Sequence, residues 1–224
     1  MEQLKLLLPL LLIFLLGCTA YRANERSYPS SGITRIDSSI EFVGPDNIHL
    51  SEAQYPRDVV LMFPYVSGAI FGTTSDTPIY IVQVDKQLNF SLDLTGKINE
   101  IDKVAAPLTE EWIRVGLTAE PGDTRITRIG TFPYSSTIES IDVGGFIDPV
   151  SRNTMILVYV DRACEIKGEV DIGREHYSHQ LIFSGKGFHW IEIVKRSKSD
   201  FILQNYHGET DIKFSVHIEN LQLI

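Results

Sequence analysis

Apolar and polar residues alternate along short stretches of the chain, which is the pattern of half-buried β-strands. The clearest case is the stretch 88–94, where Phe90, Leu92 and Leu94 fall on one face and polar residues fall on the other. Successive side chains of a strand point to opposite faces of its sheet. We therefore expect a strand here with its apolar face in a hydrophobic core.

Two other stretches, 59–63 and 155–160, are apolar on both faces, so we expect central strands there. Toward the C-terminus, strand-like segments recur with a spacing of 8–12 residues. They fall at 124–132, 137–147, 153–161, 163–170, 177–184, 188–195, 200–206 and 211–218. This rhythm is typical of sandwiches and barrels, and it predicts an all-β fold of one or two β-sandwich domains.

One part of the chain has a different periodicity. Apolar residues within 98–105 recur at helical spacing, which predicts a short helix. The stretch 109–116 is typical of a second short helix, because Thr109 suits a helix start and Gly116 suits a helix end. We expect one or two short helices near 97–116.

The sequence Glu120-Pro121-Gly122-Asp123 is a strong turn signal and the domain boundary that we expect. It divides the body into an N-terminal β-sandwich-like domain at 33–119 and a C-terminal β-sandwich domain at 120–224. We find no sequence repeat between the two halves.

The N-terminus has the features of an export signal. Residues 6–16 are apolar apart from Pro9, and this run of 11 residues is too short to span a membrane, which takes roughly 20 residues. Its length instead fits the apolar core of a secretory signal peptide. The run ends in Leu15-Leu16-Gly17-Cys18.

That ending resembles the lipobox of bacterial lipoproteins, and the resemblance covers residues 1–18. It implies that a signal peptide at 1–17 is removed and that Cys18 carries the lipid that holds the protein on a membrane. Residues 18–32 would then form the lipidated cysteine and a flexible tether. The resemblance implies a place in the bacterial cell envelope, and Thr19 favours the outer over the inner membrane. An ordinary secretory signal with a chance cysteine is the alternative.

Charge and cysteine content narrow the function classes. The formal net charge is −9, which argues against a nucleic-acid partner, since such proteins carry basic patches. The chain has two cysteines. With Cys18 lipidated, Cys164 has no cysteine to pair with, and we expect it to be a buried small apolar residue.

Five of the six histidines lie in the last 49 residues, which raises the question of a metal site. His176 and His179 are three apart in a segment that enters a strand, where such positions point to opposite faces. We therefore predict no metal site, no catalytic residues and no cofactor.

We interpret the chain as a membrane-anchored envelope protein with a non-catalytic binding or assembly role and a protein or glycan partner. One alternative is an enzyme that acts on envelope polymers such as glycans. Its candidate residues are Asp161, Glu169, Glu175, His176 and His179. A metal-binding carrier is the other alternative.

Overall fold

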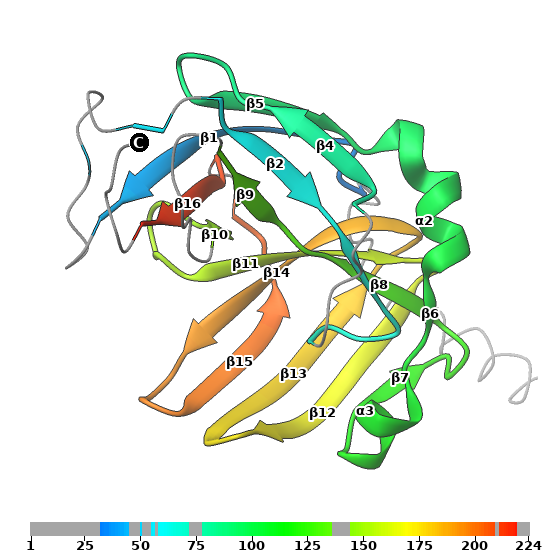
Figure 1. Ribbon diagram of the computed structural model, residues 1–224. Helices are drawn as coiled ribbons and strands as arrows, with labels where there is room; N and C mark the ends of the chain where they lie inside the picture. Colours follow the sequence, from blue (N-terminus) through cyan, green and yellow to red (C-terminus); the bar gives the residue numbers. More distant parts are fainter. Residues whose placement is uncertain are drawn as a thin grey trace, which may run out of the picture. The chain divides into compact units, whose positions relative to one another are not determined.

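A computed structural model describes residues 32–44, 50, 55–56, 58–71, 78–135, 144–208 and 211–218 (Figure 1). Within these residues the chain is mainly β-strand with two short α-helices, which confirms the predicted all-β fold. Residues 31–224 form one compact unit. Cys18 and the expected signal peptide lie outside the described residues. No helix in the described ranges is long and apolar enough to cross a membrane.

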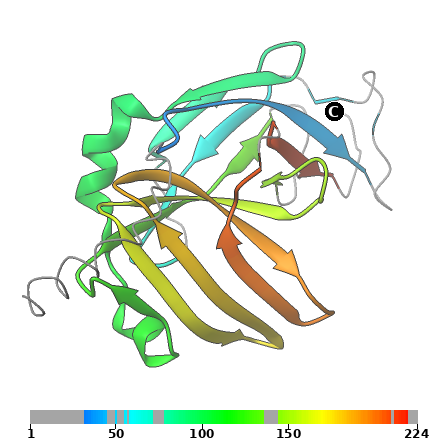
Figure 2. The ribbon, with the colours of Figure 1, turned by 180° about the vertical axis from the view of Figure 1, so that it is seen from behind.

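Thirteen of the described strands belong to one large sheet. Their bounds are β1 (Arg35–Val43), β3 (Tyr65–Ser67), β5 (Asn89–Asp93), β6 (Ala106–Pro107), β7 (Thr118–Glu120), β8 (Arg125–Ile129), β10 (Gly144–Ile147), β11 (Thr154–Val160), β12 (Cys164–Ile172), β13 (Glu175–Phe183), β14 (Gly187–Lys195), β15 (Asp200–Asn205) and β16 (Lys213–His217). The main path runs β5-β1-β16-β10-β11-β14-β15-β13-β12-β7, and β8 joins β11 to β3 and β6. Two pairs are parallel, β1 with β16 and β13 with β15. Figure 2 shows β1 in blue crossing the upper part of the unit and the yellow-to-orange strands below it.

A second sheet contains three strands, β2 (Val60–Phe63), β4 (Tyr80–Gln83) and β9 (Phe132–Tyr134), with β2 in the middle. The predicted central position of 59–63 is thus confirmed for this sheet. Both sheets combine strands from before and after residue 120, because β1 pairs with β16 and β2 pairs with β9. A division of the body at residue 120 would cut both sheets.

Strand β11 lies between two hydrophobic cores. One face contributes Met155, Leu157 and Tyr159 to the first core. The other face contributes Ile156, Val158 and Val160 to the second core. All six side chains are buried, so the double-sided apolar pattern at 155–160 arises from two cores that share one strand, and the predicted central strand is confirmed.

The first core is rich in aromatic rings. Phe146 on β10 is 3% exposed. Its ring centroid lies 4.9 Å from that of Trp190, 5.2 Å from that of Phe214, and 6.3 Å from those of Phe63 and Phe90. Aromatic pairs at such distances stabilise a core beyond the area they bury. Phe146 is therefore a central packing residue of this core.

The two predicted helices are confirmed as α2 (Ile98–Val104) and α3 (Glu110–Arg114). Thr109 is the N-cap residue of α3, as predicted, although its side chain makes no cap hydrogen bond. Its backbone N–H donates to the Gly68 carbonyl, at 3.1 Å, which connects the helix start to a neighbouring segment. Gly116 follows the helix with φ +113°, as its predicted terminating role requires.

Candidate functional site

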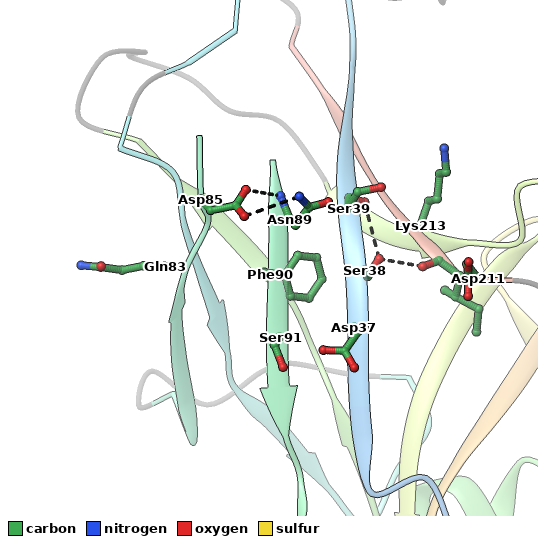
Figure 3. Close-up of a pocket in the computed structure, with 11 residues that line it drawn as sticks. Asp37, Ser38, Ser39, Gln83, Asp85, Asn89, Phe90, Ser91, Asp211 and Lys213 are labelled. Atoms are coloured by element: carbon green, nitrogen blue, oxygen red, sulfur yellow. Dashed lines mark hydrogen bonds between the residues drawn. The ribbon is translucent and has the colours of Figure 1, made fainter. Parts of the chain in front are cut away.

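An open hollow of about 730 Å³ is lined by residues of β1, β4 and β5 and by the segment that enters β16 (Figure 3). Most of its lining side chains are polar, among them Asp37, Ser39, Asn89, Ser91 and Lys213. A concave surface with several convergent polar groups is the usual form of a small-ligand site. We therefore take this hollow as the candidate site.

The floor of the hollow follows from the alternation of β1 and β5. In their antiparallel register Asp37 lies opposite Ser91, and Ser39 lies opposite Asn89. The intervening residues Ile36, Ile40, Phe90 and Leu92 are buried in the first core. Since a strand alternates its faces, the four polar side chains are directed to the outside of the sheet. They form two neighbouring polar pairs on the outer face of β1 and β5.

The turn between β4 and β5 forms one wall of the hollow. The Asp85 carboxylate accepts hydrogen bonds from the backbone N–H groups of Gln87, at 2.9 Å, and Asn89, at 2.7 Å. The Asn89 side-chain amide lies 3.4 Å from the second Asp85 oxygen, as Figure 3 shows. Asp85 therefore fixes the turn and positions Asn89 in the hollow.

The opposite wall comes from residues 211–213, which are far from β1 in the sequence. The Ser38 hydroxyl donates to the Ile212 carbonyl at 2.6 Å, across 174 positions of the chain. This bond holds Asp211 and Lys213 beside β1, and both line the hollow (Figure 3). Lys213 adds an ammonium donor to a surface that otherwise offers carboxylates, hydroxyls and amides.

Asp37 is an acidic residue of the hollow whose carboxylate accepts hydrogen bonds from two neighbours. A hydrogen bond from Ser91 and a second from Arg35, at 2.9 Å, lower the pKa of the Asp37 carboxyl below its usual value. Asp37 is therefore ionised at neutral pH and presents acceptors to the hollow. A second hollow of about 940 Å³ shares Ser39, Asp85 and Asn89 with the first and is also lined by Tyr55.

The candidate Asp161 of the enzyme alternative serves a structural role. Its nearly buried carboxylate lies 3.0 Å from the Arg125 guanidinium and 3.1 Å from that of Arg162. Burial would raise the pKa of Asp161, but hydrogen bonds from Arg125 and Arg162 outweigh it and lower that pKa. Arg125 also pairs with Asp102 on α2, at 2.9 Å, so these charges attach the helix to the large sheet.

Asp102 is the centre of this attachment. Besides Arg125, it accepts a hydrogen bond from the Tyr159 hydroxyl and one from the Lys186 ammonium, each at 2.9 Å. The pKa of the Asp102 carboxyl is lowered, with the Lys186 hydrogen bond as the largest cause. The cluster links α2, β8, β11 and the turn before β14, and we interpret it as a structural ion-pair network.

The other candidates of the enzyme alternative are not brought together with Asp161. His176 lies 2.8 Å from Asp171 and 4.0 Å from Glu169 on an exposed surface, and the Asp171 hydrogen bond raises the pKa of His176. Glu175 accepts a hydrogen bond from the Tyr177 hydroxyl at 2.6 Å. These residues form local surface contacts.

His179 is 2% exposed and lies beside Phe71, whereas the His176 side chain is 39% exposed, so the two point to opposite faces as predicted. Burial lowers the pKa of His179 to about 4, which keeps its ring neutral at pH 7. In the part of the chain that the structure describes, no group of three or more potential ligand side chains could hold a metal ion.

Cys164 is buried in the second core, as its sequence context predicts. Burial raises the pKa of the Cys164 thiol to about 11, although a hydrogen bond with Thr124 opposes the shift. Because the thiolate is the reactive form, this cysteine is chemically inert in the folded protein.

A second surface feature is the outward face of the three-stranded sheet. Ile81 is 66% exposed, Tyr134 55% and Phe132 47%, and Val60 and Met62 of β2 lie between them in the register. We call these five residues the apolar face. Single exposed apolar residues are common on proteins, but a contiguous set of them often has a function.

Sequence reasoning missed both the hollow and the apolar face. The hollow combines segments 37–39, 83–91 and 211–213, each of which has the pattern of an ordinary strand with a polar outer side. Comparison of the chain with protein-family models, with curated proteins and with solved structures finds no match. Function is therefore inferred from the chain's own residues.

Proposed function

We propose that this protein is a lipid-anchored bacterial envelope protein that binds a hydroxyl-rich ligand, such as a glycan, without catalysis. The ligand would occupy the hollow over β1 and β5. The observation that carries this proposal is the set of two polar pairs that lie opposite each other in the register of its floor, Asp37 with Ser91 and Ser39 with Asn89. The anchoring part of the proposal rests on the lipobox-like ending at Cys18.

The chemistry of the hollow favours neutral polar groups over anions. A sugar hydroxyl can donate to the Asp37 carboxylate and accept from the Asn89 amide or the Lys213 ammonium. A polyanion would meet Asp37, Asp85 and Asp211 in the same hollow, on a chain of net charge −9. Repulsion between these carboxylates and an anionic ligand in the same hollow disfavours binding.

Binding to envelope polymers tests the proposal. Lipidated protein, purified in detergent, would be sedimented with peptidoglycan sacculi and titrated with an uncharged O-polysaccharide freed of lipid A and with an uncharged capsular polysaccharide. A double variant, Asn89→Ala with Ser91→Ala, removes one hydrogen-bonding group from each floor pair. We expect it to weaken binding by about thirtyfold, since each of the two lost hydrogen bonds contributes about 1 kcal/mol.

The matched control is Gln180→Ala, which truncates an exposed amide on β13, outside the hollow. This variant should bind as the unmodified protein does. The proposal fails if none of the three polymers binds, or if the floor variant and the control variant bind equally well. Fatty-acid labelling of cells that express a Cys18→Ala variant tests the anchor separately, because loss of the label is expected only if Cys18 carries the lipid.

A further inference from the structure

We propose that the apolar face of β2, β4 and β9 lies against the membrane to which the chain is anchored. This inference goes beyond ligand binding in the hollow, but it rests on the proposed lipid at Cys18. The face would act as a second membrane contact and set the orientation of the body on the bilayer.

The strand register places six positions on this outward side, the five residues of the apolar face and Gln83. Ile81, Met62 and Phe132 form one row across the three strands, and Gln83, Val60 and Tyr134 form the next. The alternate residues Leu61, Phe63 and Tyr80 are buried in the first core. None of the six outward positions is charged, so the face offers little for an ion pair and much for apolar contact.

The size of the face argues against a second copy of the chain as its occupant. Side chains of this kind expose roughly 150–250 Å² when free, and the three largest members are about half to two-thirds exposed. They therefore present on the order of 300–400 Å², whereas a stable protein interface buries about 800 Å² on each partner. A contact that is insufficient for a dimer in solution is sufficient for a body that is already held at a surface.

The chemistry of the face suits a lipid interface. Tyrosine has an apolar ring and a polar hydroxyl, and such side chains gather where a membrane meets water. Phe132 and Ile81 supply the apolar groups that enter the boundary between headgroups and acyl chains. The net charge of −9 indicates that this contact does not depend on anionic lipids.

The expected tether makes a weak contact effective. Thirteen residues, all outside the described ranges, separate the Cys18 anchor from Gly32, the first residue of the described body. A flexible segment of that length spans roughly 20 Å r.m.s.. Linking two contacts by so short a segment gives the second a high effective concentration, up to about the millimolar range.

A single fluorescent label can test this contact. Cys164 is buried, and its thiol pKa is raised to about 11, so a thiol reagent would leave it unmodified in the folded protein. A Tyr134→Cys variant places a label on the apolar face, and a Val150→Cys variant places the same label in a turn where the residue is 77% exposed. Both lipidated variants would carry a polarity-sensitive fluorophore in phosphatidylcholine vesicles.

The Tyr134→Cys label should emit at shorter wavelength and be quenched several-fold less by iodide than the Val150→Cys label. Adding Phe132→Ser and Ile81→Ser should remove this protection, because both side chains are exposed and their loss leaves the core intact. Equal quenching at the two positions overturns the inference. Protection that persists in detergent and grows with protein concentration would assign the face to a second copy, and this result also overturns it.

The same samples separate this inference from the proposed anchoring. If mass spectrometry finds no lipid on Cys18, the anchoring proposal has failed and the inference fails with it. If the lipid is present and the Tyr134→Cys label is fully open to iodide, only the inference about the apolar face has failed.

Discussion

Replacement of Phe146 by alanine should destabilise the fold strongly. Phe146 is 3% exposed and contacts four other rings of the first core, so its removal loses the transfer free energy of the ring and leaves a cavity. Truncation of such a buried phenylalanine to alanine lowers the free energy of unfolding by about 3–5 kcal/mol. Because whole domains are stable by only about 5–15 kcal/mol, the variant should be close to the limit of folding.

The matched control is Phe132→Ala, which makes the same chemical change in strand β9, where the ring is 47% exposed. This change opens no enclosed cavity, and we expect it to cost about 1 kcal/mol or less. The contrast between the two phenylalanines tests the packing of the core rather than the loss of a phenyl ring in general.

The assay is urea unfolding of the purified protein in detergent, followed by tryptophan fluorescence. Trp190 lies 4.9 Å from Phe146, so its emission reports on this core. Stability is obtained from the midpoint and the slope of the transition, and equal slopes show that the midpoint shift is a stability change. A cost below about 1.5 kcal/mol for Phe146→Ala, or one no larger than that of Phe132→Ala, would refute the packing described for this core.

Three further predictions concern residues of β12 and β13, namely Cys164, Gly168 and His179. Burial lowers the pKa of His179 to about 4, so an unfolded chain binds a proton there between pH 6.5 and 4 that the folded chain does not. The free energy of unfolding should therefore fall as the pH is lowered through this range. In parallel denaturation curves, the free energy of unfolding of a His179→Leu variant should fall less over the same range. Cys164 should resist maleimide at pH 8 until denaturant is added; rapid labelling of folded protein would show that the thiol is not buried. Gly168→Ala should reduce the melting temperature sharply, because Gly168 has φ +136° and an added Cβ would lie 2.1 Å from the Gly116 carbonyl oxygen. Gly185→Ala is the control, because an added Cβ at Gly185 has no atom within 4 Å. Similar melting temperatures for the two variants would contradict the close approach of Gly168 to Gly116.

Local features of the fold could be predicted from the sequence because the apolar pattern of a few adjacent residues indicates which side chains are buried. The double-sided apolar run at 155–160 is strand β11, and the helical spacing within 98–105 is α2. Thr109 stands at the N-cap of α3, as predicted, but its side chain makes no cap hydrogen bond. Its backbone N–H donates to the Gly68 carbonyl, a contact with a distant segment that the local pattern at 109–116 does not show.

The pairing of distant strands could not be predicted in the same way. β1 pairs in parallel with β16, and β13 pairs in parallel with β15. The alternation of apolar and polar residues within each strand does not indicate which partner it has. An apolar face packs equally well against several partners, and the choice between them is made by the whole topology. The expected division of the body at residue 120 rests on a turn signal, which carries no information on which sheet the next strand joins.

The candidate sites depend on the same distant contacts. Asp161 and Arg125 are 36 positions apart, so the sequence shows a free carboxylate where the structure has an ion pair. The hollow depends on the bond between Ser38 and Ile212, which only the folded chain forms. Residue type shows which chemistry a position can carry, and topology decides which groups meet.

The parallel pair of β1 with β16 has a consequence for the time course of biosynthesis. The first half of β1 can bond to β5 early, but residues 40–43 bond to 214–217, the last strand that the structure describes. A ribosome adds about 5–20 residues per second, so an interval of 174 positions corresponds to a wait of roughly 10–35 s. During that wait the backbone of residues 40–43 is an open edge, which is the kind of site where chains misassociate. A chaperone that protects the newborn chain would therefore be needed most at β1 and could leave only when β16 arrives.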